Sequence, residues 1–155
     1  MIFDIHTVMK RYDMESDEQA RALRYFKALK YIIAADGDIA EAEWAALSRW
    51  MHRHQLPQEL VQAITDFDVT TVNDLSDVLP NYTKDSARAR SLIRDAIEIA
   101  RADGVFSHEE SAAVQFAARI LGVSQETVMA LEALVEMEAS TEKLRLALLS
   151  RKDNP

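Results

Sequence analysis

One short segment of the chain has the residue types and the spacing of half a calcium-binding loop. Asp36 and Gly37 are followed, after five further residues, by Glu43. In such loops the Asp supplies one oxygen, the Gly permits a sharp bend, and the distant Glu can bind the ion through both carboxylate oxygens. Asp38 adds a third acid and Glu41 adds a fourth at the rim, which suits a divalent cation such as calcium, magnesium or manganese.

The same spacing occurs a second time, 67 residues later in the chain. Asp103 and Gly104 are followed, again after five residues, by Glu110. This copy has fewer acids, because Val105 and His108 replace two acids of the first copy. Affinity for a hard cation rises with the charge of its oxygen ligands. We therefore predict that the first copy is the better cation site.

Both segments lack the first half of a calcium-binding loop. The two earlier ligand positions are Ile32 and Ala34 in the first copy, and Ile99 and Arg101 in the second. None of these side chains is a carboxylate, so water or backbone carbonyls must complete the shell of any bound ion. The dissociation constant expected for such a site is on the order of 10⁻⁴–10⁻³ M.

The same residues also have a purely structural interpretation. Gly37 and Gly104 are typical of helix C-termini, where a left-handed residue ends the helix. Glu110 is the third residue after Ser107, and this pair has the pattern of a capping box at a helix start. Glu43 has no such partner, because an alanine replaces the serine. A cation site and a capping device both remain open on the sequence.

Helices must position these segments, because composition and apolar spacing favour helix along the whole chain. Three Gly and three Pro in 155 residues are too few for the tight turns of a β fold. All three glycines fall at the ends of predicted helices. Helical spacing of apolar residues predicts the helices 17–35, 40–54, 58–66, 85–102, 107–121, 124–138 and 140–150, and shorter ones near 2–12 and 71–79. We predict an all-α bundle of about seven helices without a sheet.

An internal duplication organises these helices. Residues 32–61 align with 99–128 without a gap, and ten of the 30 aligned positions are identical, where chance would give roughly two or three. Two copies of a helical unit bury their apolar faces by packing together. We therefore predict one domain over 1–155, with repeat 1 at about 17–66 and repeat 2 at about 85–138, arranged as a bundle with pseudo-two-fold symmetry.

Composition excludes several classes of function. Without cysteine the chain has no disulfide, thiolate metal site or Cys nucleophile. It also has no Gly-x-Ser-x-Gly elbow and no phosphate-binding Gly loop, so nothing indicates an enzyme. The net charge of −8 disfavours nucleic acid, and we interpret the stripe of Arg90, Arg94 and Arg101 as a solvated face. The chain shows no secretory signal and no bilayer-spanning apolar run, so the expected location is the cytoplasm.

The twin Ala-Asp-Gly…Glu turns, each followed by a helix with Ala-Ala and then Leu or Val, resemble the TerB family of tellurite-resistance proteins. The resemblance covers about 17–150 and extends to the N-terminal domain of a membrane-anchored DnaJ-like co-chaperone. It implies a compact fold of about seven helices and an acidic surface that binds divalent cations. The matching acids are Asp36, Glu43, Asp103 and Glu110. Co-chaperone activity does not carry over, because the chain has no His-Pro-Asp triplet.

The function expected from these observations is that of a non-enzymatic, TerB-like protein. It would bind a divalent cation weakly and act as a sensor or scaffold in a metal or stress response. The alternative is a metal-free interaction module whose helical surface docks a partner protein. In either case the expected partner is a protein and not a nucleic acid, and the resemblance also allows peripheral contact with a membrane.

Overall fold

Residues 5–102, 104 and 106–150 are described by the computed structural model, with side chains from residue 17 onward. Within these residues the chain forms six α-helices, two 3-10 helices and no strand, which confirms the all-α prediction. The elements in chain order are α1 (Ile5–Ile33), α2 (Glu41–Arg53), α3 (Gln58–Asp66), η1 (Val69–Thr71), η2 (Leu75–Asp77), α4 (Ala87–Ala100), α5 (His108–Ile120) and α6 (Gln125–Leu149).

Two of the predicted helix breaks do not exist, which explains why there are fewer helices than expected. α1 continues through the predicted start at residue 17, and α6 continues through the predicted start at residue 140. Capping residues start a helix only where the chain before them is not helical, and no Gly or Pro interrupts either segment. The helix predicted near 71–79 is also wrong, because this segment forms η1 and η2, each started by the side chain of an aspartate.

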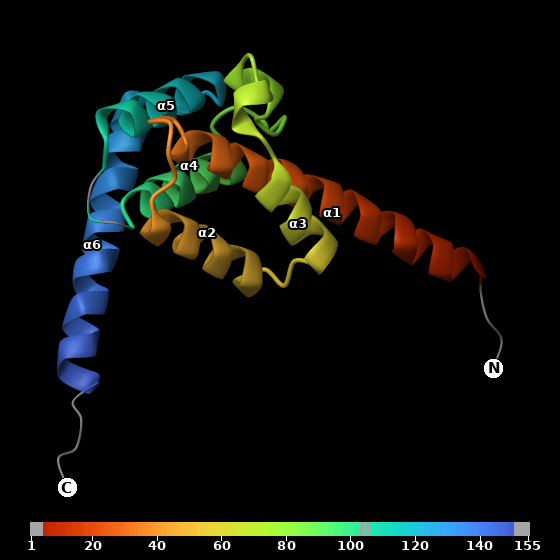
Figure 1. Cartoon of the computed structure of the whole chain (residues 1–155), viewed down its shortest axis with the longest axis horizontal. Coiled ribbons are helices and arrows are strands. Elements are labelled where there is room, and N and C mark those ends of the chain that lie inside the picture. Colours follow the sequence, from red (N-terminus) through yellow and green to blue (C-terminus); the bar gives the residue numbers. More distant parts are fainter. Residues whose placement is uncertain (1–4, 103, 105, 151–155) are drawn as a thin grey trace, which may run out of the picture.

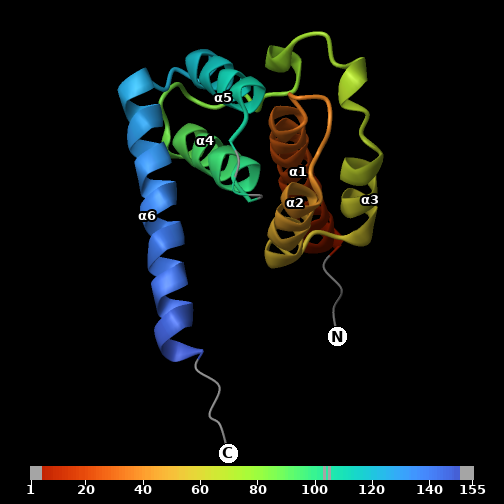
Figure 2. The ribbon, with the colours of Figure 1, turned by 60° about the vertical axis from the view of Figure 1, so that its left-hand side comes forward.

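The helices form two groups that match the two halves of the chain. Figure 2 shows α1, α2 and α3 on one side and α4, α5 and α6 on the other. α4 lies in the middle, where it packs against α1, α2, α5 and α6. Eight of its 14 residues are buried, so α4 is the centre of the core. α1 and α6 extend from this body in different directions, so the start of α1 and the end of α6 lie far apart (Figure 1).

The duplication is visible in the helix bounds. α1 and α4 end 67 residues apart, at Ile33 and Ala100. α2 and α5 both have 13 residues and start 67 residues apart. α3 and α6 also start 67 residues apart, but α3 has nine residues and α6 has 25. The local structure therefore repeats with the sequence, whereas the predicted domain and repeat boundaries and the superposition of the two halves stay predictions.

Candidate functional site

The first acidic turn connects α1 to α2 and contains the predicted sharp bend. The N–H of Ala34 donates to the carbonyl of Lys30 over 3.0 Å, and the N–H of Gly37 donates to the carbonyl of Ala34 over 3.0 Å. Gly37 then takes a φ of 98°, which residues with a side chain rarely adopt. Beyond it, Asp36 Oδ1 accepts a hydrogen bond from the N–H of Asp38 over 3.3 Å. The predicted left-handed cap at Gly37 is confirmed.

The second acidic turn connects α4 to α5 with a similar backbone. The N–H of Gly104 donates to the carbonyl of Arg101 over 2.9 Å, and Gly104 has a φ of 84°. The predicted left-handed cap is therefore confirmed here as well. Asp103, which is one of the predicted metal ligands, and Val105 lie outside the described residues.

The predicted ligands that the structure describes fall into two classes. Glu43 is 1% exposed and Glu110 is 2% exposed. In contrast, Asp36, Asp38 and Glu41 are all exposed. Burial of an ionised carboxylate is costly unless its oxygens are satisfied. The two glutamates, and not the aspartates, are therefore the residues whose surroundings need explanation.

Each buried glutamate uses one oxygen to cap the start of its own helix. Glu43 Oε1 accepts a hydrogen bond from the N–H of Ala40 over 3.0 Å. Glu110 Oε1 accepts one from the N–H of Ser107 over 3.3 Å, and Ser107 Oγ accepts one from the N–H of Glu110 over 3.0 Å. The second copy thus has a complete capping box, and the first has only the glutamate half, because alanine has no hydroxyl.

The second oxygen of Glu110 has no such explanation. Glu110 Oε2 is buried and accepts no hydrogen bond from the described residues. A buried polar atom left without a partner costs about 1–3 kcal/mol, and in most proteins such atoms are satisfied by the protein or by bound water. Capping therefore accounts for only half of this carboxylate.

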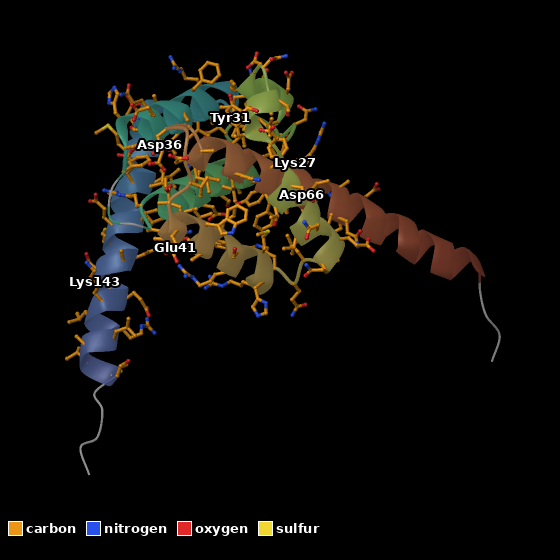
Figure 3. The ribbon with its side chains drawn as sticks, viewed as in Figure 1. Lys27, Tyr31, Asp36, Glu41, Asp66 and Lys143 are labelled. Carbon is orange, nitrogen blue, oxygen red and sulfur yellow. The ribbon has the colours of Figure 1, made fainter. Side chains whose placement is uncertain are left out.

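The described acids of the first turn do not form a metal cluster on their own. Within 5–102, 104 and 106–150, no three His, Cys, Asp or Glu side chains come together as a group that could hold a metal ion. Asp36, Asp38 and Glu43, which the sequence suggested as joint ligands, therefore do not form such a group by themselves. Figure 3 places Asp36 near the α1 end of the connection and Glu41 at the start of α2. The extended backbone at Ala40 separates these two ends.

Three arginines of α4 and its C-terminus, Arg90, Arg94 and Arg101, pair with acids. Arg94 Nη2 lies 2.7 Å from a carboxylate oxygen of Glu138 in α6, and Arg101 pairs with Glu136 in the same helix. Arg90 pairs with Asp85 over 2.8 Å. The ion pairs of Arg94 with Glu138 and of Arg101 with Glu136 therefore join α4 to α6, a role that the stripe of arginines did not reveal in the sequence.

A buried acid outside the turns links α1 to α4. Asp95 is 8% exposed and accepts a hydrogen bond from the hydroxyl of Tyr25. Its Oδ1 lies 3.1 Å from Nη1 of Arg94. Burial raises the pKa of Asp95 above its usual range, although both hydrogen bonds oppose this shift. Burial and the nearby Asp95 also raise the pKa of Tyr25. No motif in the sequence indicated this pair.

Two open grooves border the body, and neither is lined by a predicted ligand. The first, of about 660 Å³, lies between α2, the end of α4 and α6. The second, of about 770 Å³, lies between α1 and the connection from α2 to α3. Sequence reasoning missed the first groove because it divided α6 at residue 140, and residues on both sides of this position line the groove.

Among the described residues, none of the helices combines the length and the apolar composition of a membrane-spanning segment.

Comparisons with known proteins identify relatives of the chain. A family model described as "Tellurite resistance protein TerB" matches residues 22–133, a span that includes both acidic turns. The crystal structure of a tellurite resistance protein from Nostoc punctiforme is similar, with a TM-score of 0.69 and 26% sequence identity. The likeness covers 88% of this chain and 84% of that chain. None of the curated proteins matches this chain.

Proposed function

Since the chain belongs to the TerB family, we propose that it is a non-enzymatic protein that binds a divalent cation weakly through its twin acidic turns. In this proposal it acts as a sensor or scaffold in a metal or stress response. The ligands are acids of the two turns, Asp36, Asp38, Glu43, Asp103 and Glu110. Calcium, magnesium and manganese all suit such oxygen ligands.

One observation carries the proposal, the second carboxylate oxygen of Glu110. This atom is buried without a hydrogen bond from the described residues, at the start of a helix whose N-terminal dipole stabilises only part of its charge. A cation with a few waters would compensate the buried charge better than a neutral side chain can. Glu43 is buried at the equivalent position of the other turn, so both copies place a carboxylate at the same point of the repeat.

The exposed aspartate of the first turn supplies the other half of the argument. The N–H of Asp38 donates to Oδ1 of Asp36 and not to Oδ2. The Asp36 side chain lies at the surface. A hard cation at the turn would meet one exposed carboxylate and keep several waters, as weak oxygen sites do. A modest affinity follows, and a modest affinity suits a protein that senses changes in cation concentration.

A thermal melt with and without calcium, magnesium or manganese tests the proposal. A ligand that binds only the folded state raises the midpoint of the melt. At a cation concentration ten times the dissociation constant, the free energy of unfolding increases by about 1.4 kcal/mol. We expect this shift in the wild type and a smaller shift in Glu110→Gln, because glutamine keeps the cap of the second turn but not its charge. The exposed neighbour Glu109 provides the matched control, and Glu109→Gln should keep the shift.

The first turn needs its own pair of variants. Asp36→Asn combined with Glu43→Gln removes two charges from copy one, and calorimetric titration should show weaker binding of the cation. Equal binding by this variant and the wild type would identify the first turn as a capping device, and no binding by either protein would identify both turns as capping devices. A smaller shift in Glu109→Gln as well as in Glu110→Gln would point to net charge instead of a site.

A second function, a metal-free module that docks a partner protein, is favoured by a different region. The C-terminal half of α6 is exposed along its whole length and carries large apolar side chains. Apolar surface of this kind often marks an interaction site. The two functions are compatible, because the acidic turns and this half of α6 are different parts of the molecule.

A further inference from the structure

The C-terminal half of α6 carries an apolar surface that the described parts of the molecule do not cover. After Val135, every residue of α6 is exposed, and this half of the helix projects from the body (Figures 1 and 2). Eight large apolar side chains are exposed in the described chain. Seven of them belong to α6, namely Met129, Leu134, Met137, Leu144, Leu146, Leu148 and Leu149.

Four of these side chains lie on one line along the helix, which we call the outer stripe. It consists of Leu134, Met137, Thr141, Leu144 and Leu148, which alternate in steps of three and four residues. This alternation is the seam of a two-helix coiled coil. The four apolar members are 43–67% exposed, because the opposite side of the helix, with Val135, faces the body.

The two flanks of the outer stripe differ in a way that fits a second helix. One flank has Ala133, Ser140 and Ala147, seven residues apart, and such small side chains let two helix backbones approach closely. The other flank has Glu138 and Arg145, also seven residues apart and of opposite charge. About half of the surface of Glu138 is exposed although it pairs with Arg94, so it can accept a further cationic partner.

From these features we propose that two copies of this chain pair through the outer stripe, with their α6 helices antiparallel. A two-fold axis beside residues 142 and 143 places Met137 against Leu148 of the second copy. The same axis brings Glu138 near Arg145 of the second copy, and this contact forms twice. In a parallel pair Glu138 would instead lie level with another Glu138, and the small flank would offer no opposite charge.

The length of the exposed half supports the antiparallel arrangement. The last buried residue of α6 is Val135, and in the antiparallel pair residue 135 lies level with residue 150 of the second copy. The exposed halves of the two helices therefore pair along their whole length, and the buried part of each α6 begins where the other helix ends. An anionic membrane is a poorer partner, because such surfaces bind basic helices and α6 has five Glu against one Lys and one Arg.

Sedimentation equilibrium with two matched variants tests the pairing. Leu144 lies on the outer stripe and is 60% exposed, whereas Leu146 lies two residues away on another side and is 54% exposed. We expect a monomer–dimer equilibrium in the wild type. Leu144→Glu should raise the dimer dissociation constant about tenfold or more, since a charge enters the seam, and Leu146→Glu should change it little. Circular dichroism should show equal helix content in all three proteins.

Cysteine cross-linking tests the orientation, because the chain has no cysteine of its own. Under mild oxidation, Met137→Cys combined with Leu148→Cys should form a covalent dimer, and Met137→Cys alone should not. Cross-linking by the single variant would show a parallel pair and overturn the proposal. It is also overturned by a wild type that stays monomeric up to its solubility limit, or by Leu146→Glu weakening the dimer as much as Leu144→Glu.

Discussion

The two copies of the repeat end in helices of very different length. α3 and α6 start at equivalent positions, but α3 stops after nine residues and α6 continues for 25. The end of α3 is held by a residue from another helix, Lys30 of α1. Its amine donates to three carbonyls at the end of α3, over 2.9, 2.8 and 2.6 Å, which belong to Ile64, Thr65 and Phe67.

Copy two has no such contact, because the position equivalent to Lys30 is Ile97. Ile97 is fully buried in the apolar core. Lys30 is 7% exposed, its amine lies over the rings of Trp44 and Phe67, and burial lowers its pKa. Lys30 therefore holds the end of α3 from another helix, and α6 has no such contact from the equivalent position. The length of a helix in this fold is decided partly by tertiary contacts.

Replacing Lys30 is expected to have the largest effect on this comparison. Lys30→Met removes the donor for three carbonyls at the end of α3, and a hydrogen bond to a charged group contributes about 1.5–3 kcal/mol. We expect a loss of about 2–3 kcal/mol in the free energy of unfolding, measured by urea denaturation. Lys27→Met is the control, because Lys27 only lies over the ring of Phe67 and should contribute about 0.5–1 kcal/mol. Equal losses would show that Lys30 does not hold the end of α3.

The two turn glycines test whether the copies are equivalent. A Cβ at Gly37 or Gly104 would meet no atom within 4 Å, so only the backbone strain of positive φ opposes a side chain. Gly37→Val and Gly104→Val should each cost about 1–3 kcal/mol, and the two losses should be similar. Ala35→Val, in the same turn but without positive φ, should stay within about 0.5 kcal/mol. A large difference between the two glycines would mean that the turns are not alike.

The capping boxes offer a reciprocal exchange between the copies. Ser107→Ala removes the hydroxyl that accepts a hydrogen bond from the N–H of Glu110. It should lower the free energy of unfolding by about 1 kcal/mol. Ala40→Ser supplies the missing half in copy one and should add about 0.5–1 kcal/mol. Thermal unfolding measures both. A destabilising Ala40→Ser would contradict the view that copy one has half of the same device.

Replacing Asp95 should change the stability at neutral pH less than the variants above. It tests another difference between the copies, because copy one has the buried Ala28 at the equivalent position. The folded protein binds a proton at Asp95 more tightly than the unfolded chain, since burial raises its pKa above 3.8. This contribution to stability is complete below pH 3.8 and is lost as the pH rises through the folded pKa. Asp95→Asn should abolish that loss. The free energy of unfolding, measured between pH 3 and 8, should therefore depend less on pH in this variant than in the wild type. An unchanged profile would show that another group causes the pH dependence of the stability.

The sequence predicts local features of this protein better than tertiary ones. The left-handed caps at Gly37 and Gly104 and the all-helical class follow from residue type and spacing, because they depend on neighbours along the chain. The break predicted at residue 140 was wrong, since Ser and Thr can cap a helix but do not force one to start. The capping function of Glu110 could be predicted from Ser107, which lies three residues earlier in the same turn.

The candidate site was predicted only in its parts. Residue type identified the acids, but it could not show that Glu43 and Glu110 are buried while Asp36 and Asp38 are exposed. This division depends on which side of each helix faces the core. The contact between Lys30 and the end of α3, and that between Tyr25 and Asp95, join residues about 35 and 70 positions apart. No local pattern encodes such pairs.

The ion pairs between α4 and α6 have a consequence for how the protein opens. Arg101 and Arg94 hold α6 at Glu136 and Glu138, and all later residues of the helix are exposed. In the monomer, backbone amides beyond this point should therefore exchange their hydrogens by fraying from the C-terminal end of the helix, well before the body unfolds. Amides before Glu136 should exchange only with the whole core. The step in exchange rate along α6 would mark where the folded body ends and its extension begins.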